Sequence, residues 1–253
     1  MPPSPEREVT VEELAQFLEE QDYLQLWQKL SNLSLPSAEF ERFFLELRSE
    51  SDRALAIVAF SYIDEMLEQL FQRALNPEIV GGVTGLFDSF GPLSTANARI
   101  ELAAALYWIE PRTYHSLRIL RRIRNTFAHE PFASSFEDAR VASLLSSLVP
   151  LEQPLFEAMP NAFEPLERIS KRVLYHVRAA LTCHNLMAQL ATAPSAQRLG
   201  MPPHAALRKG FDAQPTALKE LDRALASIVI GLIGSPGTRA RNAKRDLGAQ
   251  GDH

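Results

Sequence analysis

The sequence predicts an all-α fold, and two observations carry this prediction. Apolar residues recur at helical spacing over most of the chain, whereas no segment alternates convincingly at the period of two that is typical of strands. Prolines and glycines separate the periodic segments. With 253 residues, 46% of them hydrophobic, the chain can bury one large core, or one core with an extension.

The first two helices are expected in the N-terminal third. Thr10 and Glu13 form a capping-box pattern, and residues 14–30 then carry apolar side chains near helical spacing. Pro36 ends this stretch. A second, long helix is predicted over residues 37–75, where Asn76-Pro77 stops it.

Residues 81–92 are rich in glycine and predict a loop, after which Ser94 or Thr95 caps a third helix that Pro111 breaks. Further helices are predicted at residues 112–129, 136–148, 167–190 and 216–233. The prolines of residues 149–165 indicate a linker or elbow. The apolar stripe of residues 216–233 must fold back on the core or bind another chain.

These elements divide the chain into four parts. They are a leader with an N-terminal helix (1–36), a main helical domain (37–192), a loop with an amphipathic helix (193–237) and a disordered basic tail (238–253).

Composition narrows the function classes. The net charge of -5 lacks the strongly basic footprint of a nucleic-acid binder, although a local basic patch stays open. Cys183 is the single cysteine, so no internal disulfide is expected, and no second pair at ligand spacing accompanies Cys183-His184. We therefore expect no metal and no cofactor. Without a signal peptide or an apolar run of ~18 residues, we expect a cytoplasmic protein with no membrane contact.

The predicted helix 112–129 holds the residues most suited to chemistry. Arg124 lies only about 40° from Leu120 of the apolar stripe, and Asn125 and His129 are four residues apart on one face. A guanidinium, an amide and an imidazole thus converge at the edge of a core. They could hold a phosphate, orient it and move a proton near neutral pH.

A structural alternative stands beside this interpretation, and chemistry alone favours it. A buried Arg124 needs a carboxylate partner, because an unpaired buried charge costs several kcal/mol. The predicted second helix offers Glu50, Asp52 and Asp64. A separate cluster, Arg118, Arg121 and Arg122, is the candidate for nucleic-acid contact.

Three segments resemble the mannitol operon repressor (MtlR) family: LRSESDRA at residues 47–54, GPLSTANARIELA at 91–103 and IRNTFAH at 123–129. The resemblance covers roughly residues 40–190. It implies an HEPN-like helical bundle, here with an extra N-terminal helix and a C-terminal helical extension. Arg124, Asn125 and His129 match the HEPN pattern of an arginine, a polar residue and a histidine. In HEPN ribonucleases these residues meet across a two-fold dimer and cleave RNA without metal, through attack by its 2′-hydroxyl.

Three functions follow. The first is an MtlR-like regulator of carbohydrate uptake genes, a homodimer that acts through a protein partner; direct DNA binding is not expected, because no helix offers a reading face. The alternative is a metal-independent, toxin-like endoribonuclease that uses Arg124, Asn125 and His129. The third is a scaffold in which this motif is core ion pairing. Solvent access discriminates among them, because a catalytic His129 must face a cleft.

Overall fold

The computed structural model describes residues 35–75, 78, 82–130, 132, 135–159, 162–198, 216–240 and 242. For residues 191–198 it describes the helical backbone only. The all-α prediction is confirmed for this part of the chain. Its β-type pairing is limited to an isolated bridge between Phe163 and Gly234. The helix predicted from Thr10 to residue 30 lies outside the described residues.

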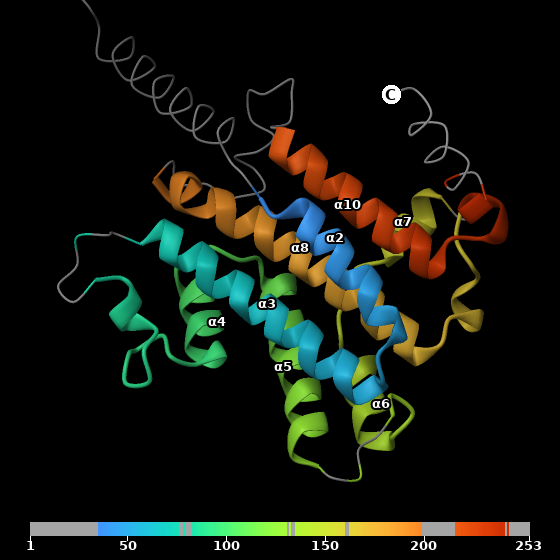
Figure 1. The fold of residues 1–253 in the computed structure, drawn as a ribbon, viewed down its shortest axis with the longest axis horizontal. Helices are drawn as coiled ribbons and strands as arrows, with labels where there is room; N and C mark the ends of the chain where they lie inside the picture. Colours follow the sequence, from blue (N-terminus) through green and yellow to red (C-terminus); the bar gives the residue numbers. More distant parts are fainter. Residues whose placement is uncertain are drawn as a thin grey trace, which may run out of the picture.

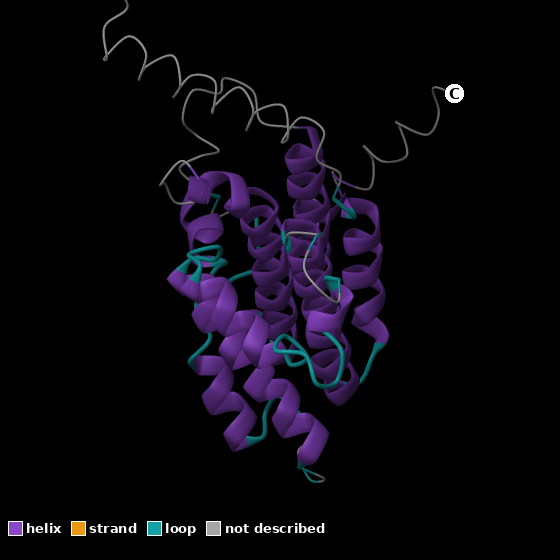
Figure 2. Cartoon of the chain, turned by 90° about the vertical axis from the view of Figure 1, so that its left-hand side faces the viewer, coloured by secondary structure: helices purple, strands orange, loops and turns teal. Residues whose placement is uncertain are grey.

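The central helix is α3 (Asp52–Ala74), which packs against α5 (Pro111–His129) and α8 (Lys171–Arg198). On the other side of α8, α10 (Thr216–Ile233) contacts both α8 and α2 (Ser37–Glu46). Figure 1 shows α2, α3, α8 and α10 running nearly alongside one another, with α4 and α5 crossing them. The remaining α-helices are α4 (Ala96–Ala105), α6 (Ala139–Ser146) and α7 (Gln153–Ala158). In Figure 2 the described residues are drawn as helices and loops, with no strand among them.

Aromatic side chains fill the centre of the bundle. Phe127 of α5 meets Phe136 edge-on, with ring centroids 5.2 Å apart, and Phe136 in turn lies 4.6 Å from the ring of Tyr175 on α8. All three are essentially buried. Because such rings bury large apolar areas, these contacts fix the C-terminal half of α5 against the core. Its outward face is therefore held rigidly.

The predicted helix 37–75 is two helices, so that prediction is wrong in detail. The α2 helix ends at Glu46, and a short 3-10 turn (Leu47–Ser49) follows. Ser51 then caps α3, accepting a hydrogen bond from the Ala54 backbone N–H at 3.2 Å. The capping serine competes with helix continuation, since its side chain satisfies a backbone donor of the new helix.

Other boundaries also differ from the predictions. Thr95, one of two predicted caps, accepts from the Ala98 N–H and begins α4. Pro111 is the first residue of α5 and not merely the end of the previous helix, because its fixed φ suits that position. The predicted linker 149–165 contains α7, and α8 begins at Lys171, later than predicted.

The helix α10 has the predicted bounds, and it folds back on the bundle. Leu218, Leu221 and Ile228 are buried in the same core as α2, α3 and α8. His184 of α8 adds a contact to Asp222 of α10 at 2.8 Å. Residues 236–240 are helical, and residues 238–240 belong to the tail that was expected to be disordered. Among the described helices, none combines the length and apolar character needed to cross a membrane.

Candidate functional site

The helix α5 separates its apolar and basic residues by face. Leu117, Leu120 and Ile123 are fully buried, so the arginines between them fall toward solvent. At the C-terminal end, the Arg53 guanidinium of α3 donates to the Glu130 carbonyl at 3.0 Å. This bond satisfies a carbonyl that the helix end leaves open, and it fixes the position of His129.

Arg124, Asn125 and His129 lie on the surface of α5. Arg124 and Asn125 are half-buried and His129 is exposed. The Arg124 Nη1 donates to the Asn125 Oδ1 at 3.1 Å. Five residues of α-helix turn through about 140° net, so Arg124 and His129 diverge to two sides. The predicted convergence therefore holds for adjacent pairs, with Asn125 between the other two residues.

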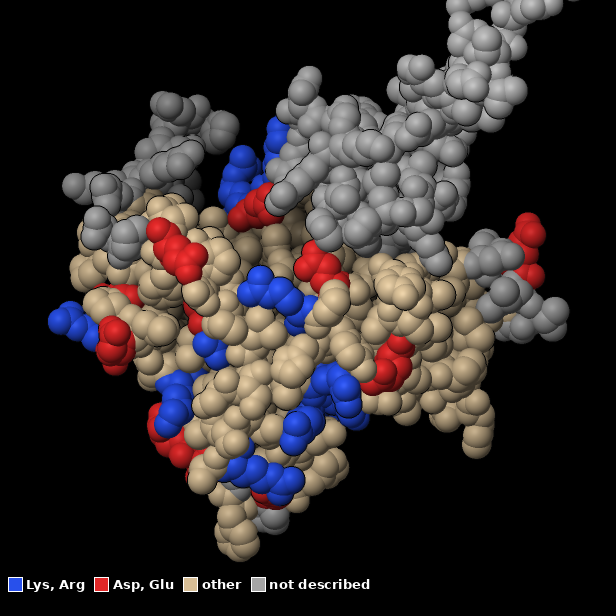
Figure 3. Space-filling view, turned by 180° about the vertical axis from the view of Figure 1, so that it is seen from behind, with Lys and Arg blue, Asp and Glu red and all other residues tan. Residues whose placement is uncertain are grey.

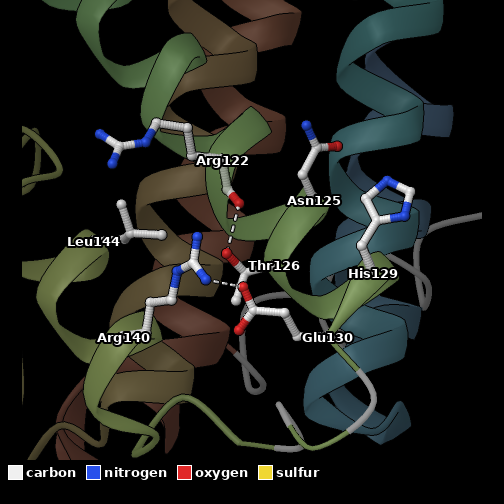
Figure 4. Close-up of a pocket in the computed structure, with 7 residues that line it drawn as sticks. All are labelled: Arg122, Asn125, Thr126, His129, Glu130, Arg140 and Leu144. Atoms are coloured by element: carbon white, nitrogen blue, oxygen red, sulfur yellow. Dashed lines mark hydrogen bonds and ion pairs between the residues drawn. The ribbon is translucent and has the colours of Figure 1, made fainter.

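His129 is one of the residues that line a polar cleft of about 260 Å³ at α5 and α6, here called the His129 cleft. In Figure 4 its ring lies on the side of α5 away from Arg140 and Leu144. In Figure 4 Asn125 and His129 lie on one side of α5, while Arg122 extends away from them. Arg140 of α6 pairs with Glu130 at the base of the cleft. The cleft is lined by Arg122, Asn125, Thr126, His129, Glu130, Arg140 and Leu144.

Arg124 opens on the opposite side, into a second cleft of about 240 Å³ between α3, α4 and α5, here called the α4 cleft. It is lined by Phe60, Ser61, Asp64, Thr95, Ala96, Asn97, Arg121, Arg124 and Asn125. Asn125 belongs to both linings. The two clefts are thus neighbours that share one side chain.

The prediction of a carboxylate partner for Arg124 is wrong. Asp64 faces the same cleft, but its Oδ1 accepts two bonds from Arg99, at 2.7 Å from Nη2 and 3.1 Å from Nε. Within the described chain, no carboxylate lies within ion-pair distance of Arg124. Because its side chain is half exposed, water can solvate the guanidinium, and no buried partner is required.

The other two predicted carboxylates support the fold elsewhere. Asp52 pairs with Arg172 of α8 at 2.7 Å, and its second oxygen accepts from the Phe136 N–H at 3.0 Å. Glu50 is exposed, and its carbonyl, not its carboxylate, accepts a bond from Arg172. Asp52 therefore joins α3, α8 and the segment before α6, without touching the motif.

The predicted basic cluster is divided among three surroundings. Arg118 stacks on Tyr114 and lies 3.8 Å from Glu101. Arg121 lines the α4 cleft, and Arg122 lines the His129 cleft. Figure 3, seen from behind, shows Lys and Arg side chains gathered on the lower part of the molecule with acidic side chains among them.

The sequence did not point to Arg140 or Asn97. Arg140 of α6 lines the His129 cleft, and Asn97 of α4 lines the α4 cleft. Neither position carries a local signal, because each reaches the site only through long-range packing. Arg99 was also missed: it is 5% exposed, and it sits in the GPLSTANARIELA segment. A charged residue at a buried helical position is the signal that could have found it.

A metal site and a cysteine nucleophile find no support among the described residues. The described chain contains no group of three or more His, Cys, Asp or Glu residues placed to hold a metal ion. Cys183 is fully buried, and desolvation raises the pKa of its thiol far above the usual range. A thiol without thiolate character is not a nucleophile. Cys183 is a residue of the hydrophobic core.

No protein-family model matches the chain, and neither a curated protein nor a solved structure matches it significantly.

Proposed function

We propose that the α5 surface binds the backbone of RNA and cleaves it without a metal ion. The observation that carries this proposal is the exposure of His129 in an open polar cleft beside Asn125. A motif that served only core ion pairing would be buried and matched by carboxylates. Instead, the imidazole is free to meet a ligand.

In this proposal the RNA 2′-hydroxyl attacks the adjacent phosphorus, and the bond from phosphorus to the 5′-oxygen breaks. The products are a 2′,3′-cyclic phosphate and a 5′-hydroxyl end. His129 takes the proton from the 2′-hydroxyl or delivers one to the leaving oxygen, which contributes about 10²–10⁴-fold. Arg124 stabilises the negative charge on the phosphoryl oxygens, and Asn125 orients them.

The divergence of Arg124 and His129 supports a dimeric site. Side chains about 140° apart on one helix do not readily reach one phosphate together. A two-fold axis near Asn125 would bring Arg124 of one protomer toward His129 of its partner. The HEPN resemblance implies this arrangement, and the proposed active form is accordingly a homodimer.

Phe132 favours an unpaired strand as the substrate. Its ring is 94% exposed, and it follows Glu130 of the His129 cleft by two residues, so its backbone lies within ~8 Å of that residue. Exposed aromatic rings near basic groups stack the bases of single-stranded RNA.

The test is cleavage of single-stranded RNA by the purified protein in EDTA, with Arg124→Ala and His129→Ala beside the wild type. We expect cleavage by the wild type and a loss of at least about 100-fold in each variant. Arg118→Ala serves as the matched control, because Arg118 lines neither cleft. Equal cleavage by all four proteins would assign the activity to a contaminant.

A second candidate is the MtlR-like regulator that acts on carbohydrate uptake through a protein partner. The net charge of -5 favours it, as do the Arg140–Glu130 and Arg118–Glu101 pairs, which neutralise part of the basic surface. Its test is capture of partners with the wild type and with His129→Ala. Failure to cleave RNA, with one defined partner recovered, would favour this candidate; tight DNA binding without a partner would contradict it.

A further inference from the structure

The α4 cleft adjoins the proposed reaction centre and shares Arg124 and Asn125 with it, whereas its other lining residues have no role in the proposed reaction. Arg124 and Asn125 form the wall toward α5, and Asn97 and Ser61 stand on α4 and α3. Because Asn125 also lines the His129 cleft, a chain bound across α5 passes from one cleft into the other. The question is which group of that chain the α4 cleft would hold.

The charge of the α4 cleft favours an anion. The carboxylate of Asp64 is matched inside the protein by Arg99, at 2.7 Å. Arg121 and Arg124 have no carboxylate within ion-pair distance in the described part of the chain. Two guanidinium groups thus lack a counter-charge from this part of the protein, on side chains about one turn apart along α5, with a rise of about 4.5 Å between them. Guanidinium groups bind phosphate through charge-assisted hydrogen bonds. Arg124 is assigned to the proposed reaction, which leaves Arg121 for a second phosphate.

Arg121 also carries a donor whose hydrogen bond is missing. Its Nε is buried and has no partner among the described atoms. Buried donors in native proteins are nearly always satisfied, by protein, water or ligand. The neutral polar residues that line the cleft carry amides and hydroxyls, Asn97 and Ser61 among them, and these groups suit the ester and sugar oxygens of a nucleotide.

We propose that the α4 cleft binds the phosphate of the nucleotide next to the scissile one, with Arg121 as the residue that holds it and Asn97 beside it. This inference rests on the proposed function, since it extends the RNA path beyond the His129 cleft. It makes the protein require at least two consecutive phosphates for full affinity. Arg121 is a binding residue and not a catalytic one.

The test is equilibrium binding of a fluorescein-labelled, 2′-O-methylated hexanucleotide over a series of salt concentrations. Methylation removes the attacking hydroxyl, so binding is read independently of cleavage. Arg121→Gln and Asn97→Asp are compared with the wild type; Arg112→Gln is the matched control, since Arg112 is exposed on α5 and lines neither cleft.

We expect about tenfold weaker binding by Arg121→Gln. The slope of log K against log salt should become shallower by roughly 0.7, the value for one released counterion on a single strand. Asn97→Asp, which places a negative charge in the cleft, should weaken binding as well. A structural defect alone would not change the salt slope, and urea unfolding of each variant checks its fold.

The inference is overturned if both cleft variants bind like Arg112→Gln, or if the wild type does not bind the oligonucleotide. If Arg121→Gln fails to fold, Asn97→Asp decides, because the Asn97 side chain makes no hydrogen bond or ion pair within the described part of the chain. The two proposals fail separately. RNA cleavage with binding insensitive to Arg121 would overturn the subsite alone, whereas Arg121-dependent binding without cleavage would overturn the ribonuclease alone.

Discussion

Two sets of arginines in this protein behave in opposite ways. Arg178 is 7% exposed and directs Nε and Nη2 at Glu152, at 3.1 Å and 2.7 Å, while Nη1 reaches the Leu145 carbonyl. Arg124, on the outer face of α5, meets only the neighbouring Asn125 amide. Arg178 is enclosed by groups of the protein itself, whereas Arg124 is accessible to solvent or a ligand.

Burial and the presence of a carboxylate partner separate structural arginines from those available to a ligand. A buried guanidinium must be matched, because removing it from water costs several kcal/mol. A half-exposed one carries no such demand, so the absence of a partner indicates a position left open for solvent or ligand. We therefore expect substitution of the buried arginines to lower the free energy of unfolding, and substitution of the arginines in the two clefts to weaken ligand binding.

The largest effect should come from Arg178→Met, which leaves the carboxylate of Glu152 buried without its partner. The Glu152 side chain is 3% exposed. We expect the free energy of unfolding to fall by about 3–5 kcal/mol, as for other broken buried pairs. Urea denaturation followed by circular dichroism measures it. A double variant, Arg178→Met with Glu152→Leu, should recover much of the lost free energy of unfolding. A loss below about 1 kcal/mol in the single variant would contradict the structural role assigned to the buried pair.

Unlike Arg178, His176 is a buried titratable group without a counter-charge in the described chain. It is 2% exposed, and its Nε2 has no partner among the described atoms. Desolvation lowers its pKa to about 4, and the charges of Arg172 and Arg48 act in the same direction, against a hydrogen bond with the Phe44 backbone. The folded protein thus keeps the imidazole neutral.

The unfolded chain binds the proton near pH 6.5 and the folded protein only near pH 4, so stability is full above pH 6.5 and falls as the pH drops toward 4. This shift corresponds to about 3 kcal/mol. His176→Leu should flatten the pH dependence in that window, as measured by urea unfolding at each pH. An equal slope in wild type and variant would contradict the role of His176.

Arg172 is intermediate between the two sets. Its side chain is 24% exposed and that of its partner Asp52 is 22% exposed. Since water partly solvates both groups, Arg172→Met should cost less than Arg178→Met, about 1–3 kcal/mol, chiefly through lost charge-assisted bonds. A cost equal to that of Arg178→Met in the same denaturation experiment would show that exposure does not grade these pairs.

The sequence predicts this fold well where one helix explains its own pattern. The apolar stripe of residues 216–233 predicts α10 with the observed bounds, and the stripe of 112–129 predicts α5 to within one residue. It fails at Ser51, where one capping hydroxyl divides a helix without interrupting the apolar pattern strongly. The short helix α7 lies in a segment whose prolines indicate a linker.

The site is predictable only in its local part. The sequence identifies Arg124, Asn125 and His129, but the convergence predicted for all three holds only for adjacent pairs, because Arg124 and His129 lie about 140° apart on the helix. It cannot tell which carboxylate meets which arginine, because Asp64 and Arg99 are 35 residues apart and come together only through packing of α3 on α4. For the same physical reason, Arg140 and Asn97 stayed hidden.

We propose that the motif on α5 faces a ligand and contributes little to the core. The most direct measurement is the free energy of unfolding of His129→Ala, determined in the same preparation that is assayed for RNA cleavage. We predict a change within about 0.5 kcal/mol, as for other exposed positions, together with loss of cleavage. A destabilisation above about 2 kcal/mol would contradict this proposal and assign His129 a structural role in the core.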